Sequence, residues 1–345
     1  MNSDSVEVFS KRYTPEYWEK LLAFSRKAYP RRDPERYRLY ADYVLNVLPE
    51  DKTVPHRHLI IVNPEDEIVG LNMYLPCRLW NGVRERKSCW SFETKVLDDY
   101  RKTDAGMLIF SDSIAVKSRC GLGLSAIAQA ATKIKEKFGT RWCAKLRLAV
   151  KLNVLGLLKQ KFFGKRPPTD AFPARAGDFS RIEGVRELRI GNEGYWNKIP
   201  DVMEFCRDHG FLERRFLKNP VKHALYKYNG NCRENTPYFA VRAANIRGFV
   251  WLLVVDYRLD FSDDEIFRKI VTAATGICKK SGFAGVAIAS SIPRLTEQLK
   301  ARHFLIKKDS PADFVSSGVL ESPLEKMTFF VTSADSDNDF GWNRN

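Results

Sequence analysis

The chain has 345 residues and a mass of 39.7 kDa, enough for two domains of average size or one large one. Hydrophobic residues make up 44% and aromatic residues 12%, so a large core can form and a wholly disordered chain is excluded. The net charge of +15 favours polyanionic partners such as nucleic acid, anionic lipid or the phosphates of nucleotides and coenzymes.

Hydropathy and the N-terminal residues argue for a soluble, cytoplasmic protein without membrane insertion. No stretch reaches the roughly 18 uncharged apolar residues of a membrane-spanning helix, and the start of the chain lacks the basic-then-apolar layout of a secretory signal. The seven cysteines are odd in number and include no CxxC pair, which argues against a disulfide framework or a zinc site. His56 and His58 alternate as on a strand and are interpreted as a solvated strand edge, so no metal is expected.

The first half of the chain is predicted to open with helices and to continue with strands. Thr14 and Pro15 begin the first helix, and the strongest turn signal is the Asn81-Gly82 pair between two strands. Helical spacing of apolar residues predicts a later helix that begins at Ser125. The expected order is helix to Tyr29, helix 34–48, strands 58–62, 68–75 and 88–97, helix 104–110, strand 114–116, helix 125–138 and strand 142–152.

Residues 153–185 change character and are predicted to be a linker or crossover, because Pro and Gly cluster there among basic residues. Strands, a capped helix, a strand and a second helix then recur, offset by roughly 160 residues from the first set. The helix after Ser262 has a full capping box, Ser262 to Glu265. The sequence therefore predicts an α/β (mixed-sheet) fold with an N-terminal domain at 1–152 and a C-terminal domain at 186–345. The strands expected in the second half are 238–242, 248–256, 286–289 and 327–332.

Several motifs, in their order along the chain, resemble those of the GNAT superfamily of acyl-coenzyme A-dependent acyltransferases. Residues 96–107, VLDDYRKTDAGM, are similar to the segment V-x-P-x-Y-R-G-x-G-x-G that cradles the coenzyme pyrophosphate. Residues 123–139 are similar to the family's later helix, and 212–220 with the Asp-rich 332–340 resemble the tandem members. The resemblance implies two GNAT-like domains in tandem and acyl-coenzyme A as co-substrate. It assigns cofactor binding to Val96, Leu97, Arg101, Lys102, Thr103, Ala105, Gly106, Met107 and Ser125.

The loop itself makes physical sense as a diphosphate site, because backbone N–H groups at a helix N-terminus attract negative charge. Lys102 and Asp104 stand where the family usually has glycines, and only Gly106 is kept. The alternative is a plain strand–turn–helix in which Asp104 is the helix N-cap. Val255 to Arg258, at the corresponding place in the second half, run straight into the Ser262 capping box, so one coenzyme site is expected.

Acyl transfer to an amine requires a group that removes a proton, and Glu93, on the strand before the loop, is the candidate catalytic base. The alternative for Glu93 is a solvated strand carboxylate. The family's general-acid tyrosine is replaced here by Lys135, so no acid is assigned. Arg214 and Arg215 are candidates for gripping a phosphate of the acceptor, or alternatively for ion pairs with acidic residues such as Asp335–Asp339.

Three functions follow. The first is an acyl-coenzyme A-dependent N-acyltransferase whose acceptor is the amino group of a nucleotide-linked sugar, for surface polysaccharide synthesis. The second is a transferase that takes an aminoacyl group from tRNA, as other tandem members do; the net charge favours tRNA, but the sequence contains no long coiled-coil arm or basic tail. The third is a binding protein that kept the fold without the activity. Thermal stabilisation by coenzyme A separates the first from the second, which predicts salt-dependent tRNA binding.

Overall fold

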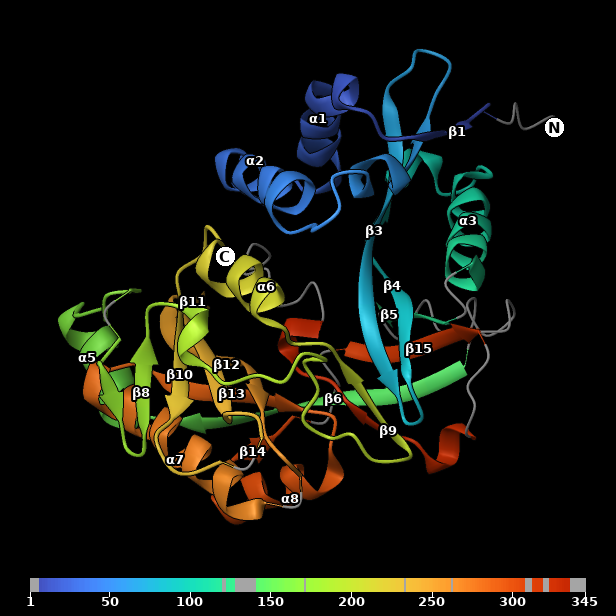
Figure 1. Cartoon of the computed structure of the whole chain (residues 1–345). Helices are drawn as coiled ribbons and strands as arrows, with labels where there is room; N and C mark the ends of the chain where they lie inside the picture. The colour runs from blue at the N-terminus through green and yellow to red at the C-terminus, as the bar shows by residue number, and fades with distance from the viewer. Residues whose placement is uncertain are drawn as a thin grey trace. The chain divides into compact units, whose positions relative to one another are not determined.

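A computed structural model of the chain describes residues 6–119, 122–127, 141–170, 172–232, 234–261, 263–307, 312–318 and 323–335. The chain forms two compact units. Unit 1 comprises Met1–Arg78, Arg86–Trp142 and Phe314–Leu320, and unit 2 comprises Leu79–Glu85, Cys143–Asp313 and Glu321–Asn345. Each unit combines a β-sheet with helices, so the predicted α/β class is confirmed (Figure 1).

Unit 1 contains strands in the order β1-β2-β3-β4-β5-β15, with helices beside them. The last residues of β3 turn into β4 at Asn81-Gly82, as predicted: Gly82 has a φ of 91°, which a side chain would strain, and the Asn81 side chain accepts the Arg84 N–H. The bounds are β1 Phe9–Arg12, α1 Trp18–Ala28, α2 Pro34–Asp42, β2 Leu59–Val62, β3 Ile68–Asn81, β4 Glu85–Val96, α3 Ala105–Arg119, β5 Leu122–Ile127 and β15 Ala312–Gly318.

Two predictions for unit 1 are wrong. The strand expected at 114–116 lies inside α3, which is one long helix because Ala105, Ile109 and Ser113 repeat at helical spacing and are all buried. The helix expected to begin at Ser125 is also wrong there, since Ser125 belongs to strand β5. Residues 126 and 127 also lie in β5, and residues 128–138 of that predicted helix lie outside the described residues.

Unit 2 contains strands in the order β6-β13-β12-β11-β10-β8-β7, and the predicted linker region 153–185 holds α5, β7 and β8. The neighbours β10, β11 and β12 are antiparallel, whereas β12 and β13 are parallel. The bounds are β6 Arg141–Leu152, α5 Val154–Phe163, β7 Arg175–Ala176, β8 Phe179–Ile182, β9 Val202–Phe205, α6 His209–Leu212, β10 His223–Tyr228, β11 Tyr238–Ile246, β12 Phe249–Arg258, α7 Asp264–Ser281, β13 Gly285–Ser290, α8 Pro293–Ala301, β14 Leu305–Ile306 and β16 Thr328–Phe330.

Helix α7 covers the sheet of unit 2 with the apolar face that its sequence predicts. Ile266, Ile270, Ala274 and Ile277 are all buried in the core of the unit. The predicted N-cap differs by one position: Asp263 caps the helix, and Ser262 lies outside the described residues. A carboxylate one residue nearer the helix can reach the Glu265 and Ile266 N–H groups directly.

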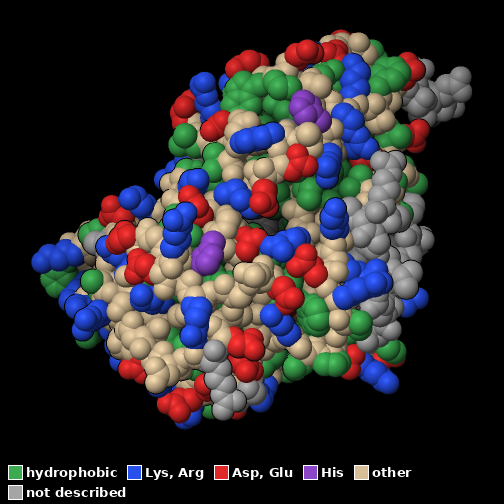
Figure 2. Space-filling view, viewed as in Figure 1, with side chains coloured by type: hydrophobic (Ala, Val, Ile, Leu, Met, Phe, Trp, Pro, Cys, Tyr) green, Lys and Arg blue, Asp and Glu red, His purple; other side chains and the backbone are tan. Residues whose placement is uncertain are grey.

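The surface mixes charges of both signs. On the face shown in Figure 2, Lys and Arg side chains are interspersed with Asp and Glu over much of the surface. Among the described helices, none is long and apolar enough to cross a membrane. The described residues contain no group of three His, Cys, Asp or Glu side chains able to hold a metal ion.

Candidate functional site

Strand β4 has a kink just after the residues that pair in parallel with β5. Cys89 to Ser91 pair with Gly123 to Ser125, and two residues later Glu93 has a φ of 49°. A positive φ is uncommon for a residue other than glycine, and such strained positions cluster at functional sites. β4 then ends at Val96, and the chain passes through a loop into helix α3.

Unit 2 repeats this arrangement. β12 pairs in parallel with β13 over Leu252 to Val254, and its register against β11 shifts at the next residue, Val255. β12 then leads into α7. Both units therefore place an irregular strand residue at the end of a parallel pair and follow it with a helix.

The loop between β4 and α3 leaves the N-terminus of α3 open. Gly106 and Met107, in the first turn of α3, have no acceptor for their N–H groups within the described part of the chain. A Cβ atom added to Gly106 would meet nothing within 4 Å, so the backbone there is accessible. The Lys102 side chain is exposed beside it. The predicted loop thus combines free backbone N–H donors, the exposed Lys102 cation and open space next to Gly106.

The other residues of this loop hold it in place. Leu97 donates its N–H to the Val69 carbonyl at 2.9 Å, and Val96 and Leu97 pack against the core of the unit. Arg101 pairs with Asp98 at 2.7 Å. The Thr103 hydroxyl, rather than the Asp104 carboxylate, accepts the Ala105 N–H, at 3.2 Å. Ser125 lies apart from this loop in sequence, on β5 opposite Ser91.

Glu93 is buried, so its interpretation as a solvated strand carboxylate is wrong; it is 5% exposed. The Tyr29 hydroxyl donates to its Oε2 at 2.9 Å, the Tyr40 hydroxyl donates to its Oε1 at 3.3 Å, and an Arg32 nitrogen lies 3.4 Å from Oε1. The donors come from α2 and from the segment between α1 and α2. These three residues were not identified from the sequence, although the high density of tyrosines in residues 29–43 was a signal for hydroxyl donors there.

The aromatic rings around Glu93 also hold the arginine. The Arg32 guanidinium carbon lies 3.5 Å from the centre of the Tyr29 ring and 5.8 Å from that of Tyr37. Burial, together with the Glu93 charge, raises the pKa of Tyr29 and of Tyr37. Both phenols therefore keep their protons, and Tyr29 acts as a donor to the carboxylate. Tyr29 is half-buried, whereas Tyr40 is completely buried.

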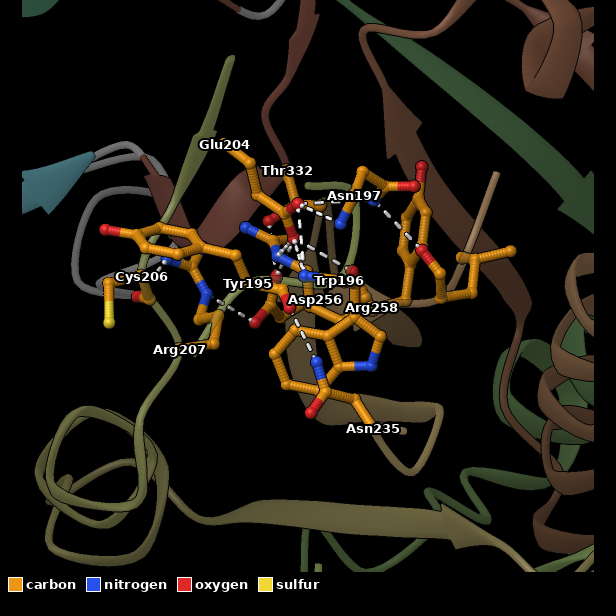
Figure 3. A network of polar contacts seen from close by, with 12 residues as sticks. Tyr195, Trp196, Asn197, Glu204, Cys206, Arg207, Asn235, Asp256, Arg258 and Thr332 are labelled. Carbon is orange, nitrogen blue, oxygen red and sulfur yellow. Dashed lines mark hydrogen bonds and ion pairs between the residues drawn. The ribbon is translucent and has the colours of Figure 1, made fainter. Parts of the chain in front are cut away.

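In unit 2, the irregular end of β12, which corresponds to the kinked end of β4, is surrounded by charged side chains of the same unit (Figure 3). Asp256, next to the irregularity in β12, is fully buried; Arg207 Nε donates to it at 2.9 Å, as do Arg258 Nη1 at 2.9 Å and the Tyr238 hydroxyl at 2.7 Å. Burial opposes ionisation of Asp256, but the two guanidinium groups outweigh it and hold its pKa below the usual value.

Two further carboxylates complete this buried charge cluster. Asp335 pairs with Arg207 and, at 3.2 Å, with Arg258. Glu204 lies 3.5 Å from Arg258 and accepts the Asn197 N–H at 3.0 Å, and burial raises its pKa. The N-terminus of α7 is likewise occupied, since Asp263 accepts its first N–H groups. The N–H groups in the first turn of α7 are therefore bonded within the chain, whereas those of Gly106 and Met107 in α3 are free within the described part of the chain.

The remaining predicted residues lie in unit 2. Arg214 and Arg215 belong to a π-helical turn, Glu213–Leu217. Arg215 is 2% exposed and donates to the Ala334 carbonyl at 3.3 Å, while Arg214 is half-buried. Asp335, one of the acids considered as a partner for them, pairs with Arg207 and Arg258. Lys135 lies outside the described residues.

Several solved structures share this fold. A GCN5-related N-acetyltransferase from Anabaena variabilis is 12% identical with a TM-score of 0.57, and the match covers 90% of this chain and 72% of that one. A putative acetyltransferase from Pyrococcus horikoshii is 12% identical with a TM-score of 0.53, over 97% of both chains. The N-myristoyltransferase of Saccharomyces cerevisiae, solved with bound myristoyl-CoA and inhibitors, is 14% identical with a TM-score of 0.57, over 99% of this chain and 86% of that one.

Comparison with models of protein families and with curated proteins gives no match. At identities of 12–14% the structural likeness establishes the fold alone, which this chain shares with a GCN5-related N-acetyltransferase and an N-myristoyltransferase. A shared fold does not by itself specify an activity, which depends on the residues of the site.

Proposed function

We propose that the protein is an acyl-coenzyme A-dependent N-acyltransferase and that unit 1 holds the coenzyme. The observation that carries the proposal is the open N-terminus of α3 directly after the kinked strand β4. Unpaired N–H groups at the start of a helix are a natural site for phosphate, and the fold is shared with acyltransferases. The coenzyme diphosphate is assigned to the Gly106 and Met107 N–H groups, with Lys102 adding positive charge.

For the chemical step we propose that Glu93 takes the proton of the acceptor. The amine nitrogen attacks the thioester carbon, a C–N bond forms, the C–S bond breaks, and coenzyme A leaves as the thiolate. Because Glu93 is buried, the proton passes through Tyr29: the nitrogen gives its proton to the Tyr29 oxygen while the Tyr29 hydroxyl proton moves to Glu93, 2.9 Å away.

As acceptor we propose the amino group of a sugar carried on a nucleotide diphosphate, a precursor of surface polysaccharide. The support is the net charge of +15, which suits two diphosphate-bearing substrates. Arg214, half-buried, is the residue proposed to contact the acceptor phosphate. Arg215 is buried and donates to Ala334, so it would have to move before it could take part.

The experiment that tests the coenzyme site is a thermal melt with and without coenzyme A, followed by an assay of thiol release from acetyl-coenzyme A with a panel of nucleotide amino sugars. We expect coenzyme A to raise the melting temperature and one amino sugar to release thiol. If coenzyme A leaves the melting temperature unchanged, the proposed coenzyme site is wrong. If it binds but no amino sugar reacts, the acceptor proposal is wrong and the coenzyme site stands.

A further inference from the structure

Helix α5, in unit 2, displays its apolar side chains to solvent. Val154 is 62% exposed, Leu155 70%, Leu158 42% and Phe162 67%. Their spacing of one, three and four residues places them in one stripe along the helix. Phe163, at the C-terminal end, is 70% exposed. A contiguous apolar stripe on a surface marks a site of interaction.

The inner face of α5 explains why this stripe points outward. Gln160 is buried and binds the backbone of Val250, accepting its N–H at 2.7 Å and donating to its carbonyl at 3.2 Å. Asn153 donates to the Phe283 carbonyl at 2.9 Å. Gly156 lies so close that an added Cβ would be 2.2 Å from the same carbonyl oxygen. The helix is thus attached through hydrogen bonds and a close glycine contact on its inner face, and the residues of the apolar stripe remain exposed on its outer face.

Cations surround the apolar stripe. Lys159 and Lys161 flank it on either side, and Lys165 and Arg166 follow the helix; all four are exposed. None of the four forms an ion pair with another described residue. The Lys161 ammonium lies 5.4 Å from the centre of the Phe162 ring. Figure 2 shows hydrophobic side chains among Lys and Arg at the end of the view where Figure 1 places α5.

We propose that α5 docks the protein on the surface of an anionic phospholipid bilayer. Apolar side chains enter the boundary between headgroups and acyl chains, while the flanking lysines meet the lipid phosphates. The charge pattern selects this partner over a second copy of the chain, because four unpaired cations in each copy would repel one another across a shared interface. Three of the four residues in the stripe are aliphatic, which favours lipid over the stacked bases of single-stranded RNA.

Co-sedimentation of the full chain with vesicles tests the proposal. We expect binding to an equimolar mixture of phosphatidylcholine and phosphatidylglycerol, and none to phosphatidylcholine alone. The double variant Leu155→Ser/Phe162→Ser should weaken binding by roughly tenfold or more. Leu305→Ser is the matched control, since Leu305 is 65% exposed elsewhere in the same unit, and it should bind like the wild type.

A second pair of variants tests the cations. Lys159→Gln/Lys161→Gln should weaken binding to the anionic vesicles by about 30-fold, because each cation near a charged bilayer adds a similar amount to the binding free energy. Added salt should weaken wild-type binding. Melting temperatures with and without coenzyme A show that each variant is folded, and they keep this result separate from that of the coenzyme site.

Four results would overturn the proposal: no binding to anionic vesicles, equal binding by the wild type and the double Ser variant, loss of binding in the Leu305→Ser control as well, or RNA binding that depends on Phe162. A wild-type dimer that the double Ser variant converts to monomers would overturn it too, by showing that α5 is covered by a second copy.

Discussion

Arg32 and Glu93 form an ion pair at 3.4 Å in the interior of unit 1, with the guanidinium held over the Tyr29 ring. The Arg32 side chain is 15% exposed and that of Glu93 only 3%. Removing one partner of such a pair leaves the other charge buried, which costs about 3 kcal/mol. The pair therefore fixes the segment between α1 and α2 against the kink in β4, whatever its part in catalysis.

Replacing Glu93 by Gln tests its chemical role while keeping its shape. If Glu93 is the base, turnover should fall by roughly 10²–10⁴-fold, and the stabilisation by coenzyme A should not change. The defect should shrink as rising pH deprotonates the amine without help. Steady-state rates across pH measure this, and near wild-type activity at neutral pH would leave Glu93 with a structural role only.

The relay through Tyr29 has a matched control in the same cluster. Tyr29→Phe and Tyr40→Phe each remove one hydrogen bond to Glu93, but only the Tyr29 side chain is partly exposed. We expect Tyr29→Phe to lower turnover by roughly 10²-fold or more and Tyr40→Phe to have a smaller effect. Equal losses in the two variants would mean that both tyrosines act by positioning the carboxylate.

Gly106→Asp should abolish the thermal stabilisation by coenzyme A, because a carboxylate at the open helix N-terminus blocks and repels the diphosphate. Gly276→Asp is the control: Gly276 also has open space around its Cβ position, but it lies within α7. Melting curves with and without coenzyme A compare the two. A shift that persists in Gly106→Asp would exclude this loop.

His58 should make the stability of unit 1 depend on pH. It is 1% exposed, its Nδ1 accepts the Tyr74 N–H at 3.1 Å, and burial lowers its pKa to about 3. This burial shows that the interpretation of His58 as part of a solvated strand edge is wrong. Because the unfolded chain binds a proton at a higher pH than the folded chain does, the free energy of unfolding should fall as the pH drops from about 6.5 toward 3, by about 1.4 kcal/mol per pH unit.

Chemical denaturation at a series of pH values measures this slope. His58→Asn keeps an acceptor for the Tyr74 N–H but does not titrate, so its free energy of unfolding should fall less steeply over the same interval. An identical slope in the variant and the wild type would assign the pH dependence to other groups.

Asp335→Asn should destabilise unit 2 by about 3 kcal/mol, since it removes a charge that compensates two buried guanidinium groups. Glu297→Gln breaks an exposed ion pair with Lys300 and should cost less than about 1 kcal/mol. Urea denaturation compares the two variants. Similar small losses would show that Arg207 and Arg258 are compensated by Asp256 and Glu204 alone.

Local patterns predicted the elements whose signals are local. The apolar repeat of Ile266, Ile270, Ala274 and Ile277 located α7, and the Asn81-Gly82 pair located a hairpin. The run Ile114 to Val116 misled because β-branched residues favour strands when taken alone, whereas here they continue a helix packed on the sheet.

The environments of the polar residues were not predictable in this way. In the sequence Glu93 is one polar residue of a predicted strand, and in the structure it is enclosed by side chains from 53 to 64 residues away. Likewise Arg207 meets Asp256, 49 residues distant, and Asp335, 128 residues distant. Periodicity describes a single element, so it cannot show which charges meet across the sheet.

The chain order of the buried charge cluster bears on how the protein is made. A ribosome delivers Arg207 long before Asp335, and the guanidinium group has one of its carboxylate partners only when the later segment emerges. Unit 1 likewise includes Phe314–Leu320, and unit 2 includes Leu79–Glu85. Neither unit is a continuous piece of chain, and unit 1 is complete only after residues 314–320 have been made, which follow most of unit 2 in the sequence. We expect folding to finish late in synthesis, with contacts of high sequence separation setting its pace.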